Sequence, residues 1–380
     1  MRFLHTGDWH IGKKLGDFSL KEEQWDVFKK IEKIAFEEQV DAIVIAGDIY
    51  DRSLASEESV ALFNKMLEKL NIKDKFPLLI ISGNHDSATR LSIGGKWMKE
   101  SGVFIATELD EAFEPVNIGD TQFFLLPFFQ PYQARNYFDN PEIRETRDAI
   151  PLIVDQMKKK FLPDRHHVLV AHFFASGNKK SAAQTDEKVG GIDMVPLDML
   201  ADFDYVALGH IHNPRALKNQ HICYSGTPLK FSASEAGQQK GVRIIDLDPF
   251  SNRFLPLKSL NEVRVLKGDF SQVISPDSYQ EINRQKDYVA VELTDTKPVY
   301  DAFNRLEDIY PRLFSLERVG TSMKRANSPA ALAAQASQPR RQDPMDILAD
   351  FYEKETGRKL DSAQSDWAKS ILNQVKKEDK

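Results

Sequence analysis

Five short clusters of Asp, His, Asn and Gly punctuate the first 212 residues of the chain. Each cluster directly follows an apolar run of the kind that forms a buried strand, as Ala42 to Ala46 does before Gly47-Asp48. Ligands of layered α/β domains gather outside the carboxyl ends of such strands, so we expect the clusters to share one rim. The side chains that would meet there are Asp8, His10, Asp48, Asn84, His172, His210 and His212.

This set of oxygen and imidazole donors is large enough to hold two metal ions. One cluster alone is weak, because a Gly-Asn-His-Asp run is often only a turn, but five clusters at strand ends favour a metal site. The two oxygens of Asp48 would let its carboxylate bridge two ions ~3.5 to 4 Å apart. The remaining donors are expected to divide into Asp8, His10 and His212 for one ion and Asn84, His172 and His210 for the other.

The donor types limit the metal and the chemistry. No Cys stands among them, and mixed carboxylate, amide and imidazole donors suit manganese, iron or zinc, of which we expect Mn²⁺. Two divalent ions against the carboxylates of Asp8 and Asp48 leave about two positive charges at the site. Such a site would attract a phosphodiester anion, and a hydroxide bridging the ions would hydrolyse it.

His85 follows the expected ligand Asn84 and is predicted to remain free of metal. From this position it would protonate the departing oxygen of the substrate. Asp51, three residues after Asp48, is expected to orient the His85 imidazole as a hydrogen-bond acceptor, as carboxylates commonly do. The alternative is that Asp51 caps the helix that follows its loop.

Length and composition describe an ordinary globular protein. The 380 residues exceed the usual size of a single core, so we expect one large domain and at least one smaller unit. No apolar run is long enough to span a bilayer, no signal peptide is apparent, and the single cysteine, Cys223, cannot form an internal disulfide. A cytoplasmic location is expected. The net charge of −6 argues only weakly against a nucleic-acid partner, because metal ions supply local positive charge.

The pattern along the chain predicts four segments. Residues 1–258 alternate strand-like runs with amphipathic helices, for example over Leu20 to Gln39 and Glu57 to Leu70. Residues 259–321 read as a small α+β domain, with one helix expected over Ser278 to Arg284. Residues 322–343 are rich in Ala, Ser, Gln and Pro and predict a linker. Residues 344–380 predict two short amphipathic helices, with apolar stripes at Ile347 to Phe351 and Trp367 to Val375.

The order and spacing of the clusters resemble one known family, the calcineurin-like metallophosphoesterases. The matching segments are Gly7-Asp8-x-His10, Gly47-Asp48-x-x-Asp51, Gly83-Asn84-His85-Asp86, His172 and Gly209-His210-x-His212. The resemblance implies an α/β fold in which a two-sheet sandwich flanked by helices carries a two-metal site. It places the seven donors at the family's ligand positions and His85 at the position of its catalytic histidine.

Finer features are similar to one bacterial branch of this family, whose members are nuclease subunits that work with an ATPase. They are the opening Phe3 to Lys13 and the later Tyr224-Ser225-Gly226-Thr227-Pro228. This resemblance implies metal-dependent DNA cleavage, as double-strand exonuclease and single-strand endonuclease, in repair and recombination. Asp51 departs from the archaeal and eukaryotic relatives, which tend to carry a second histidine there.

The same resemblance implies partners. Residues 259–321 would be a capping domain, two nuclease subunits would pair, and the helices of residues 344–380 would bind the coiled-coil base of the ATPase. The tail could instead fold back on its own capping domain. Two other hypotheses for the function of the whole chain remain. One is a phosphatase or nucleotide phosphodiesterase acting on small substrates, and the other is a scaffold with a decayed site.

Overall fold

The computed structural model describes residues 1–177, 188–189, 192–280 and 282–319. Near the carboxyl terminus it describes residues 345, 352, 360–362, 364–365 and 367–369. The predicted linker over residues 322–343 and most of the predicted helical tail therefore lie outside the described residues. Two compact units are formed, one from Met1–Leu293 with Val299–Glu317 and one from Thr294–Pro298 with Arg318–Lys380.

Two mixed β-sheets form the centre of the first unit. The larger has six strands in the order β17-β16-β1-β4-β5-β6, in which β1, β4, β5 and β6 run parallel. The smaller has five strands in the order β15-β14-β9-β8-β7, of which the first four run parallel. The strands of the six-stranded sheet are β1 (Arg2–Thr6), β4 (Ala42–Ala46), β5 (Leu78–Ile81), β6 (Val103–Ala106), β16 (Gly241–Leu247) and β17 (Phe250–Pro256). Those of the five-stranded sheet are β7 (Val116–Ile118), β8 (Thr121–Leu126), β9 (His166–His172), β14 (Tyr205–Gly209) and β15 (Ile222–Tyr224).

The two sheets pack face to face through an apolar core. Phe3, Val44, Leu79, Val168 and Ala207 belong to this core, and each is fully buried. The strands that supply them are nearly continuous apolar runs, as expected for parallel strands covered on both faces. The structure thus confirms the predicted α/β fold with a two-sheet sandwich.

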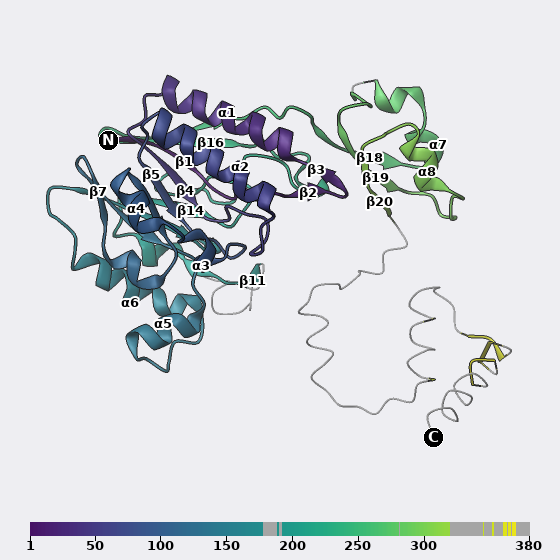
Figure 1. Ribbon diagram of the computed structural model, residues 1–380. Coiled ribbons are helices and arrows are strands. Elements are labelled where there is room, and N and C mark those ends of the chain that lie inside the picture. Colours follow the sequence, from purple (N-terminus) through teal and green to yellow (C-terminus); the bar gives the residue numbers. More distant parts are fainter. Residues whose placement is uncertain are drawn as a thin grey trace. The chain divides into compact units, whose positions relative to one another are not determined.

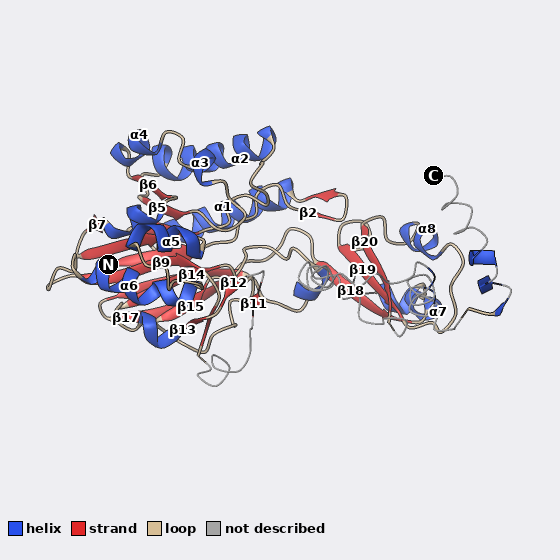
Figure 2. Cartoon of the chain, turned by 90° about the horizontal axis from the view of Figure 1, so that it is seen from below, coloured by secondary structure: helices blue, strands red, loops and turns tan. Residues whose placement is uncertain are grey.

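Helices cover the outer faces of both sheets (Figures 1 and 2). The six-stranded sheet packs against α1 (Lys21–Glu37) and α2 (Glu57–Leu67), and the five-stranded sheet against α5 (Pro131–Phe138) and α6 (Thr146–Lys158). The remaining helices of this part are the π-helix η1 (Glu68–Lys73), α3 (Ala88–Leu91), α4 (Gly95–Glu100), and the 3₁₀ helices η2 (Leu109–Phe113), η3 (Leu197–Leu200) and η4 (Ala233–Glu235). Short strand pairs complete it: β2 (Lys14–Leu15) with β3 (Phe18–Ser19), β10 (Ala175–Ser176) with β13 (Val195–Pro196), and β11 (Lys188–Val189) with β12 (Ile192–Asp193).

The two helices predicted over Leu20 to Gln39 and Glu57 to Leu70 are both present. The first is α1, and the second is α2 followed by η1. In α1 the apolar side chains of Val27, Phe28 and Ile31 recur at helical spacing and are buried against the sheet. Helix α2 begins after Ser56, whose hydroxyl accepts a hydrogen bond from the main-chain nitrogen of Ser59 at 3.2 Å. Among the described residues, none of the helices combines the length and apolar character needed to cross a membrane.

A third sheet follows the sandwich in the sequence. Its strands β18 (Val263–Gly268), β19 (Tyr288–Leu293) and β20 (Leu313–Arg318) pack on α7 (Phe270–Val273), η5 (Pro276–Tyr279) and α8 (Ala302–Glu307) around a small apolar core. The change of sheet falls between β17 and β18, and the division into domains at residues 258 and 259 stays a prediction.

The helix predicted over Ser278 to Arg284 is wrong. The chain forms the 3₁₀ helix η5 (Pro276–Tyr279), and the described residues that follow, 280 and 282–287, are not helical. The carboxylate of Asp287 accepts hydrogen bonds from the main-chain nitrogens of Asn283 and Glu262, both at 3.1 Å, and so draws this segment out of helical geometry.

One buried carboxylate joins the third sheet to α1. Glu23 is 4% exposed and accepts hydrogen bonds from Tyr288 Oη at 2.7 Å and Asn261 Nδ2 at 2.8 Å. The guanidinium of Arg312 lies 3.6 Å from the same oxygen. Because Glu23 is almost completely shielded from solvent, these partners offset the free-energy cost of burying its carboxylate.

Candidate metal centre

The five predicted clusters meet at one rim of the sandwich. Three follow β1, β4 and β5, which lie side by side in the six-stranded sheet, and two follow β9 and β14 in the other sheet. Strands β9 and β14 are in register, so that His172 stands opposite Gly209. Donors far apart in the sequence are therefore brought together by the shared direction of parallel strands.

The backbone at this rim adopts conformations that side chains rarely tolerate. Asp8, His10, Asp48 and His210 have positive φ angles of 51°, 43°, 49° and 95°. Hydrogen bonds between the first two clusters hold these turns, from Asp8 N to Gly47 O and from His10 N to Asp48 O, both at 2.9 Å. Backbone strain of this kind concentrates at functional sites, where the surrounding structure enforces it.

Two glycines allow the loops to approach each other closely. A Cβ atom on Gly83 would collide with Asp48 Oδ1 and with the Asp48 main chain, and one on Gly209 with the carbonyl oxygen of Ala46. The glycines of the sequence clusters thus provide the space in which the donors converge.

The donors predicted for the first ion face one another. His10 Nε2 lies 3.2 Å from His212 Nε2. Asp8 is fully buried, and its Oδ1 accepts a hydrogen bond from the main chain of His210 at 2.8 Å. Its Oδ2 is buried with no hydrogen-bond partner in the described part of the chain. One ligand atom each of Asp8, His10 and Asp48 lie within 4.8 Å of one another.

The second group of donors surrounds the side-chain oxygen of Asn84. This oxygen lies 3.0 Å from His172 Nε2 and 3.1 Å from His210 Nδ1. The other ring nitrogen of His172 donates to the carbonyl oxygen of Ala46 at 2.9 Å. Nε2 of a neutral His172 therefore carries a free lone pair directed at the centre of the group.

Asp48 stands between the two groups. Its Oδ2 lies 3.4 Å from His172 Nε2 and 3.7 Å from His10 Nε2, while its Oδ1 accepts a hydrogen bond from the main chain of His85 at 2.9 Å. This is the position predicted for a carboxylate shared by two ions.

The arrangement fits two cations. Two imidazole nitrogens 3.2 Å apart, and a ring nitrogen 3.0 Å from an amide oxygen, bring lone pairs together that need a proton or a metal ion between them. The unpartnered oxygen of Asp8 is a further acceptor without a donor. All seven predicted ligands lie at this place, and their oxygen and imidazole donors suit a divalent transition metal.

Burial controls the protonation of these groups. It raises the pKa of Asp8 to about 6 and lowers the pKa of His10 to about 3, which keeps the His10 imidazole neutral. For His172, burial acts to lower the pKa, but the charge and hydrogen bonding of Asp48 outweigh it and raise the pKa to about 9. For Asp48, burial acts upward, and the neighbouring His172 brings the net pKa well below the usual range.

His85 lies beside the centre with its ring 4.9 Å from that of His10. Its Nδ1 donates a hydrogen bond to an oxygen of Asp51 at 2.8 Å, but that oxygen is the main-chain carbonyl. The Asp51 carboxylate lies 2.8 Å from Lys13 Nζ and 4.0 Å from His10 Nδ1. The prediction that the Asp51 side chain orients His85 is therefore wrong. The main-chain carbonyl of Asp51 accepts the hydrogen bond instead.

Sequence reasoning missed three supporting side chains. Asp86 accepts hydrogen bonds from the main-chain nitrogens of Ile49, Tyr50 and Gly83 at 2.9 to 3.0 Å and so joins two clusters. Its place in the Gly83-Asn84-His85-Asp86 run was the signal that could have found it. Glu235 accepts from His212 Nδ1 at 2.9 Å, and no pattern near either residue indicates this contact.

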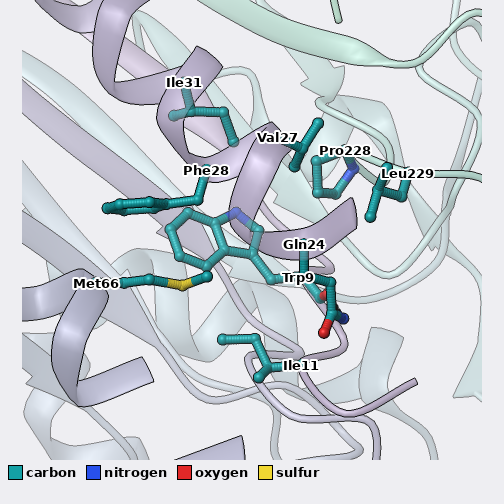
Figure 3. Close-up of a pocket in the computed structure, with 9 residues that line it drawn as sticks. All are labelled: Trp9, Ile11, Gln24, Val27, Phe28, Ile31, Met66, Pro228 and Leu229. Atoms are coloured by element: carbon teal, nitrogen blue, oxygen red, sulfur yellow. Dashed lines mark hydrogen bonds between the residues drawn. The ribbon is translucent and has the colours of Figure 1, made fainter. Parts of the chain in front are cut away.

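The third missed residue, Gln24, supports the first cluster from α1. Its Nε2 donates to the carbonyl oxygen of His10 at 2.8 Å, and its Oε1 accepts from the main chain of Gly12 at 3.2 Å. Figure 3 shows Gln24 beside Trp9, whose indole lies in an apolar pocket with Phe28 and Met66. Trp9 lies between two predicted ligands in the sequence, so this anchoring fixes the turn that presents them.

Two known protein families match parts of this chain. Residues 1–214 match the family described as calcineurin-like phosphoesterase. Residues 259–356 match a family described as the type 5 capsule protein repressor C-terminal domain. The D subunit of the SbcCD nuclease from Staphylococcus epidermidis (strain ATCC 12228 / FDA PCI 1200) is 33% identical over 376 residues, which cover 98% of each chain.

Two solved structures are also similar at low identity. The protein TT1561 of Thermus thermophilus has a TM-score of 0.43 and 12% identity, covering 68% of this chain and 99% of its own. The phosphoesterase Yfce from E. coli has a TM-score of 0.28 and 12% identity, covering 68% of this chain and 100% of its own.

The match over residues 1–214 and the 33% identity along nearly the whole chain agree with the two-sheet fold and the rim of donors. The chain belongs to the calcineurin-like phosphoesterase family and, within it, to the D subunits of SbcCD nucleases. It is accordingly a hydrolase of phosphate esters, with candidate ligands for divalent metal at the rim.

Proposed function

We propose that this chain is a nuclease subunit that cleaves DNA phosphodiester bonds with two Mn²⁺ ions. On this proposal it acts as an exonuclease on duplex ends and as an endonuclease on single strands and hairpins, in DNA repair and recombination. The convergence of Asp8, His10, Asp48, Asn84, His172, His210 and His212 on one rim carries the proposal. The relationship to the SbcCD nuclease supports DNA as the substrate.

The chain's own residues divide the work of the reaction. When bound, the two ions supply positive charge to the phosphate and activate water for attack. Asp8, His10 and His212 would hold one ion, and Asn84, His172 and His210 the other. The carboxylate of Asp48 would be shared between them.

His85 supplies the acid on this proposal. Its Nδ1–H stays on the main-chain carbonyl of Asp51, which fixes the ring and leaves Nε2 as the nitrogen that faces the substrate. A proton on Nε2 would pass to the departing oxygen of the DNA strand. The role of Asp51 is then to position His85 through its main chain, while its carboxylate forms an ion pair with Lys13.

The proposal includes a partner and a location. The S. epidermidis relative is by its name one subunit of an SbcCD complex, which supports an SbcC-type ATPase as the partner of this chain. We assign its binding to residues 344–380, with two nuclease subunits in a heterotetramer in the cytoplasm. Trp367, the first residue of the second predicted apolar stripe, lies among the described residues, and its side chain is 69% exposed.

One assay tests the substrate. The purified chain is incubated with Mn²⁺ and either a hairpin DNA or a small aryl phosphodiester, with and without the ATPase. We expect the hairpin to be cut, and a variant with Asp48→Asn to be inactive on both substrates. Hydrolysis of the small ester with intact DNA in every mixture would favour the alternative, a phosphatase or nucleotide phosphodiesterase.

A further inference from the structure

His212 is held from behind by a buried carboxylate. Its Nδ1 lies 2.9 Å from Glu235 Oε1, and a carboxylate can only accept, so Nδ1 carries the proton. The tautomer thereby leaves Nε2 of neutral His212 free as the donor atom, and Nε2 is the atom that lies 3.2 Å from His10 Nε2. Glu235 ends η4 and is 5% exposed.

The second oxygen of Glu235 is bound to a buried lysine. Lys240 Nζ lies 2.6 Å from Glu235 Oε2, and its side chain is 1% exposed. Phe231 N and Thr227 Oγ1 lie 3.3 and 3.4 Å from the same oxygen. With both oxygens occupied, Glu235 has little freedom to turn away from His212.

The lysine also holds the main chain of the same histidine. Lys240 Nζ donates to the carbonyl oxygen of His212 at 3.0 Å, and Thr227 N donates to it at 3.2 Å. The ring of His212 is thus fixed through Glu235 and its backbone through Lys240. His212 needs this support, because its side chain is 34% exposed and is not enclosed as that of His172 is.

The lysine has an electrostatic consequence as well. A lone carboxylate behind a ligand would cancel part of the positive charge that attracts a phosphodiester. Lys240 neutralises Glu235, so the pair orients the imidazole and leaves the net charge of the centre unchanged. The sequence gives no indication of this pair, since its members lie 23 and 28 residues beyond His212.

The supporting contacts of two other histidines at the site are different in kind. His172 Nδ1 and His85 Nδ1 both donate to main-chain carbonyl oxygens, of Ala46 and Asp51. A main-chain acceptor survives any side-chain substitution, whereas the acceptor of His212 does not. The support of His212 can therefore be removed selectively.

We propose that Glu235, neutralised by Lys240, is a positioning residue that sets the tautomer and direction of His212 and thereby the affinity of one of the two metal sites. The inference rests on the proposed two-metal function. Outer partners of metal-bound histidines typically contribute ~10- to 100-fold in metal affinity. We expect a loss of this size at the site served by His212 and little change at the other.

The test is Mn²⁺ titration of the full chain by calorimetry, with electron paramagnetic resonance of the same samples. Glu235→Gln keeps an oxygen that can accept from His212, and Glu235→Ala removes the acceptor, so the loss should be graded and larger for Ala. In both variants one Mn²⁺ should bind at wild-type affinity. The spectrum of an isolated ion should then replace that of a coupled pair.

Two controls keep the result interpretable. Since a single substitution leaves Lys240 buried without its partner, the double variant Glu235→Leu with Lys240→Met replaces the ion pair by apolar groups, which is often tolerated. It should fold and show the same selective loss. Glu23→Gln removes an equally buried carboxylate that contacts no predicted ligand, and should bind both ions normally.

The outcomes separate the inference from the function on which it rests. If the wild-type chain binds no Mn²⁺, the two-metal proposal itself is overturned. If the wild type binds two ions and every Glu235 variant binds them equally well, the positioning role alone is wrong. Equal weakening of both sites would also contradict it, because that would mark a general structural effect.

Discussion

Nδ1 of His85 lies 2.8 Å from the main-chain carbonyl oxygen of Asp51. The carboxylate of the same residue points elsewhere, with Oδ1 2.8 Å from Lys13 Nζ. One residue thus makes two separate contacts, one that fixes the candidate acid and one that forms an ion pair at the edge of the site. Substitution can remove the second contact without removing the first.

Asp51→Asn should therefore be mild. The main-chain acceptor of His85 remains, and Asn is close to Asp in size, so we expect the rate to fall by less than ~10-fold, in contrast to loss of an acid–base group. The measurement is the turnover of hairpin DNA at saturating Mn²⁺. A loss as large as that of a His85 variant would show that the carboxylate itself takes part in catalysis.

His85→Asn should separate catalysis from metal binding. His85 is assigned to proton transfer, so its loss should lower the rate by ~10² to 10⁴ while two Mn²⁺ still bind. Metal analysis and the nuclease assay on one preparation provide both numbers. Release of metal by this variant would place His85 among the ligands.

Gly83→Ala should damage the centre through geometry alone. A Cβ atom at this position collides with Asp48 Oδ1 and with the Asp48 main chain, which cannot move far because Asp48 has a positive φ of 49°. We expect weaker binding of both ions, since Asp48 is the shared donor, and a lower melting temperature. Gly95→Ala is the control, because its Cβ would meet nothing within 4 Å. Unchanged Mn²⁺ binding by Gly83→Ala would argue against the bridging position of Asp48.

The part of the site that the sequence predicts consists of residues with a local signal. Asp48 and His172 each stand directly at the end of an apolar run, and parallel strands carry such ends to the same edge. Glu235 has no such signal, because it contacts His212 from 23 residues further along the chain, beyond β15. The turn that follows β4 determines which oxygen of Asp51 faces His85. The residue types of this segment do not predict the geometry of that turn.

In the fold, too, the elements with a clear local sequence pattern were predicted and the long-range contacts were not. The alternation of apolar strands and amphipathic helices predicts the sandwich and its helices, since long periodic segments report burial directly. The helix expected over Ser278 to Arg284 failed where periodicity was short and a side chain, Asp287, bound the main chain instead. Long-range contacts such as that of Glu23 with Tyr288 are decided by the packing of the third sheet against α1.

Acid should release the metal ions in two stages. The pKa of His172 is raised to about 9, so Mn²⁺ binding at pH 7 must displace a proton from its imidazole. Burial raises the pKa of Asp8 to about 6, so below that pH the carboxyl also holds a proton and competes with the metal. His10 does not compete, because its pKa is lowered to about 3.

Apparent affinity should therefore fall more steeply with decreasing pH below pH 6 than above it. Calorimetry in buffers of different ionisation enthalpy counts the protons released. We expect more protons to be released near pH 5 than near pH 7, because Asp8 is then protonated before the ions bind. A proton count that stays constant across this range would contradict the assignment of Asp8 as a ligand.

Tyr288→Phe should weaken the attachment of the third sheet to α1 without touching the metal centre. The substitution keeps the buried ring, over which the Arg312 guanidinium lies at 4.9 Å, and removes only the hydroxyl that donates to Glu23 at 2.7 Å. A hydrogen bond to a buried charge contributes ~1.5 to 3 kcal/mol, so thermal unfolding should begin a few degrees lower.

Tyr132→Phe is the matched control, since Tyr132 is 55% exposed. Mn²⁺ affinity should stay at the wild-type value, because Glu23 contacts no predicted ligand. A fall in Mn²⁺ affinity would instead show that α1 transmits the loss through the neighbouring Gln24, whose amide holds the carbonyl of His10 at 2.8 Å.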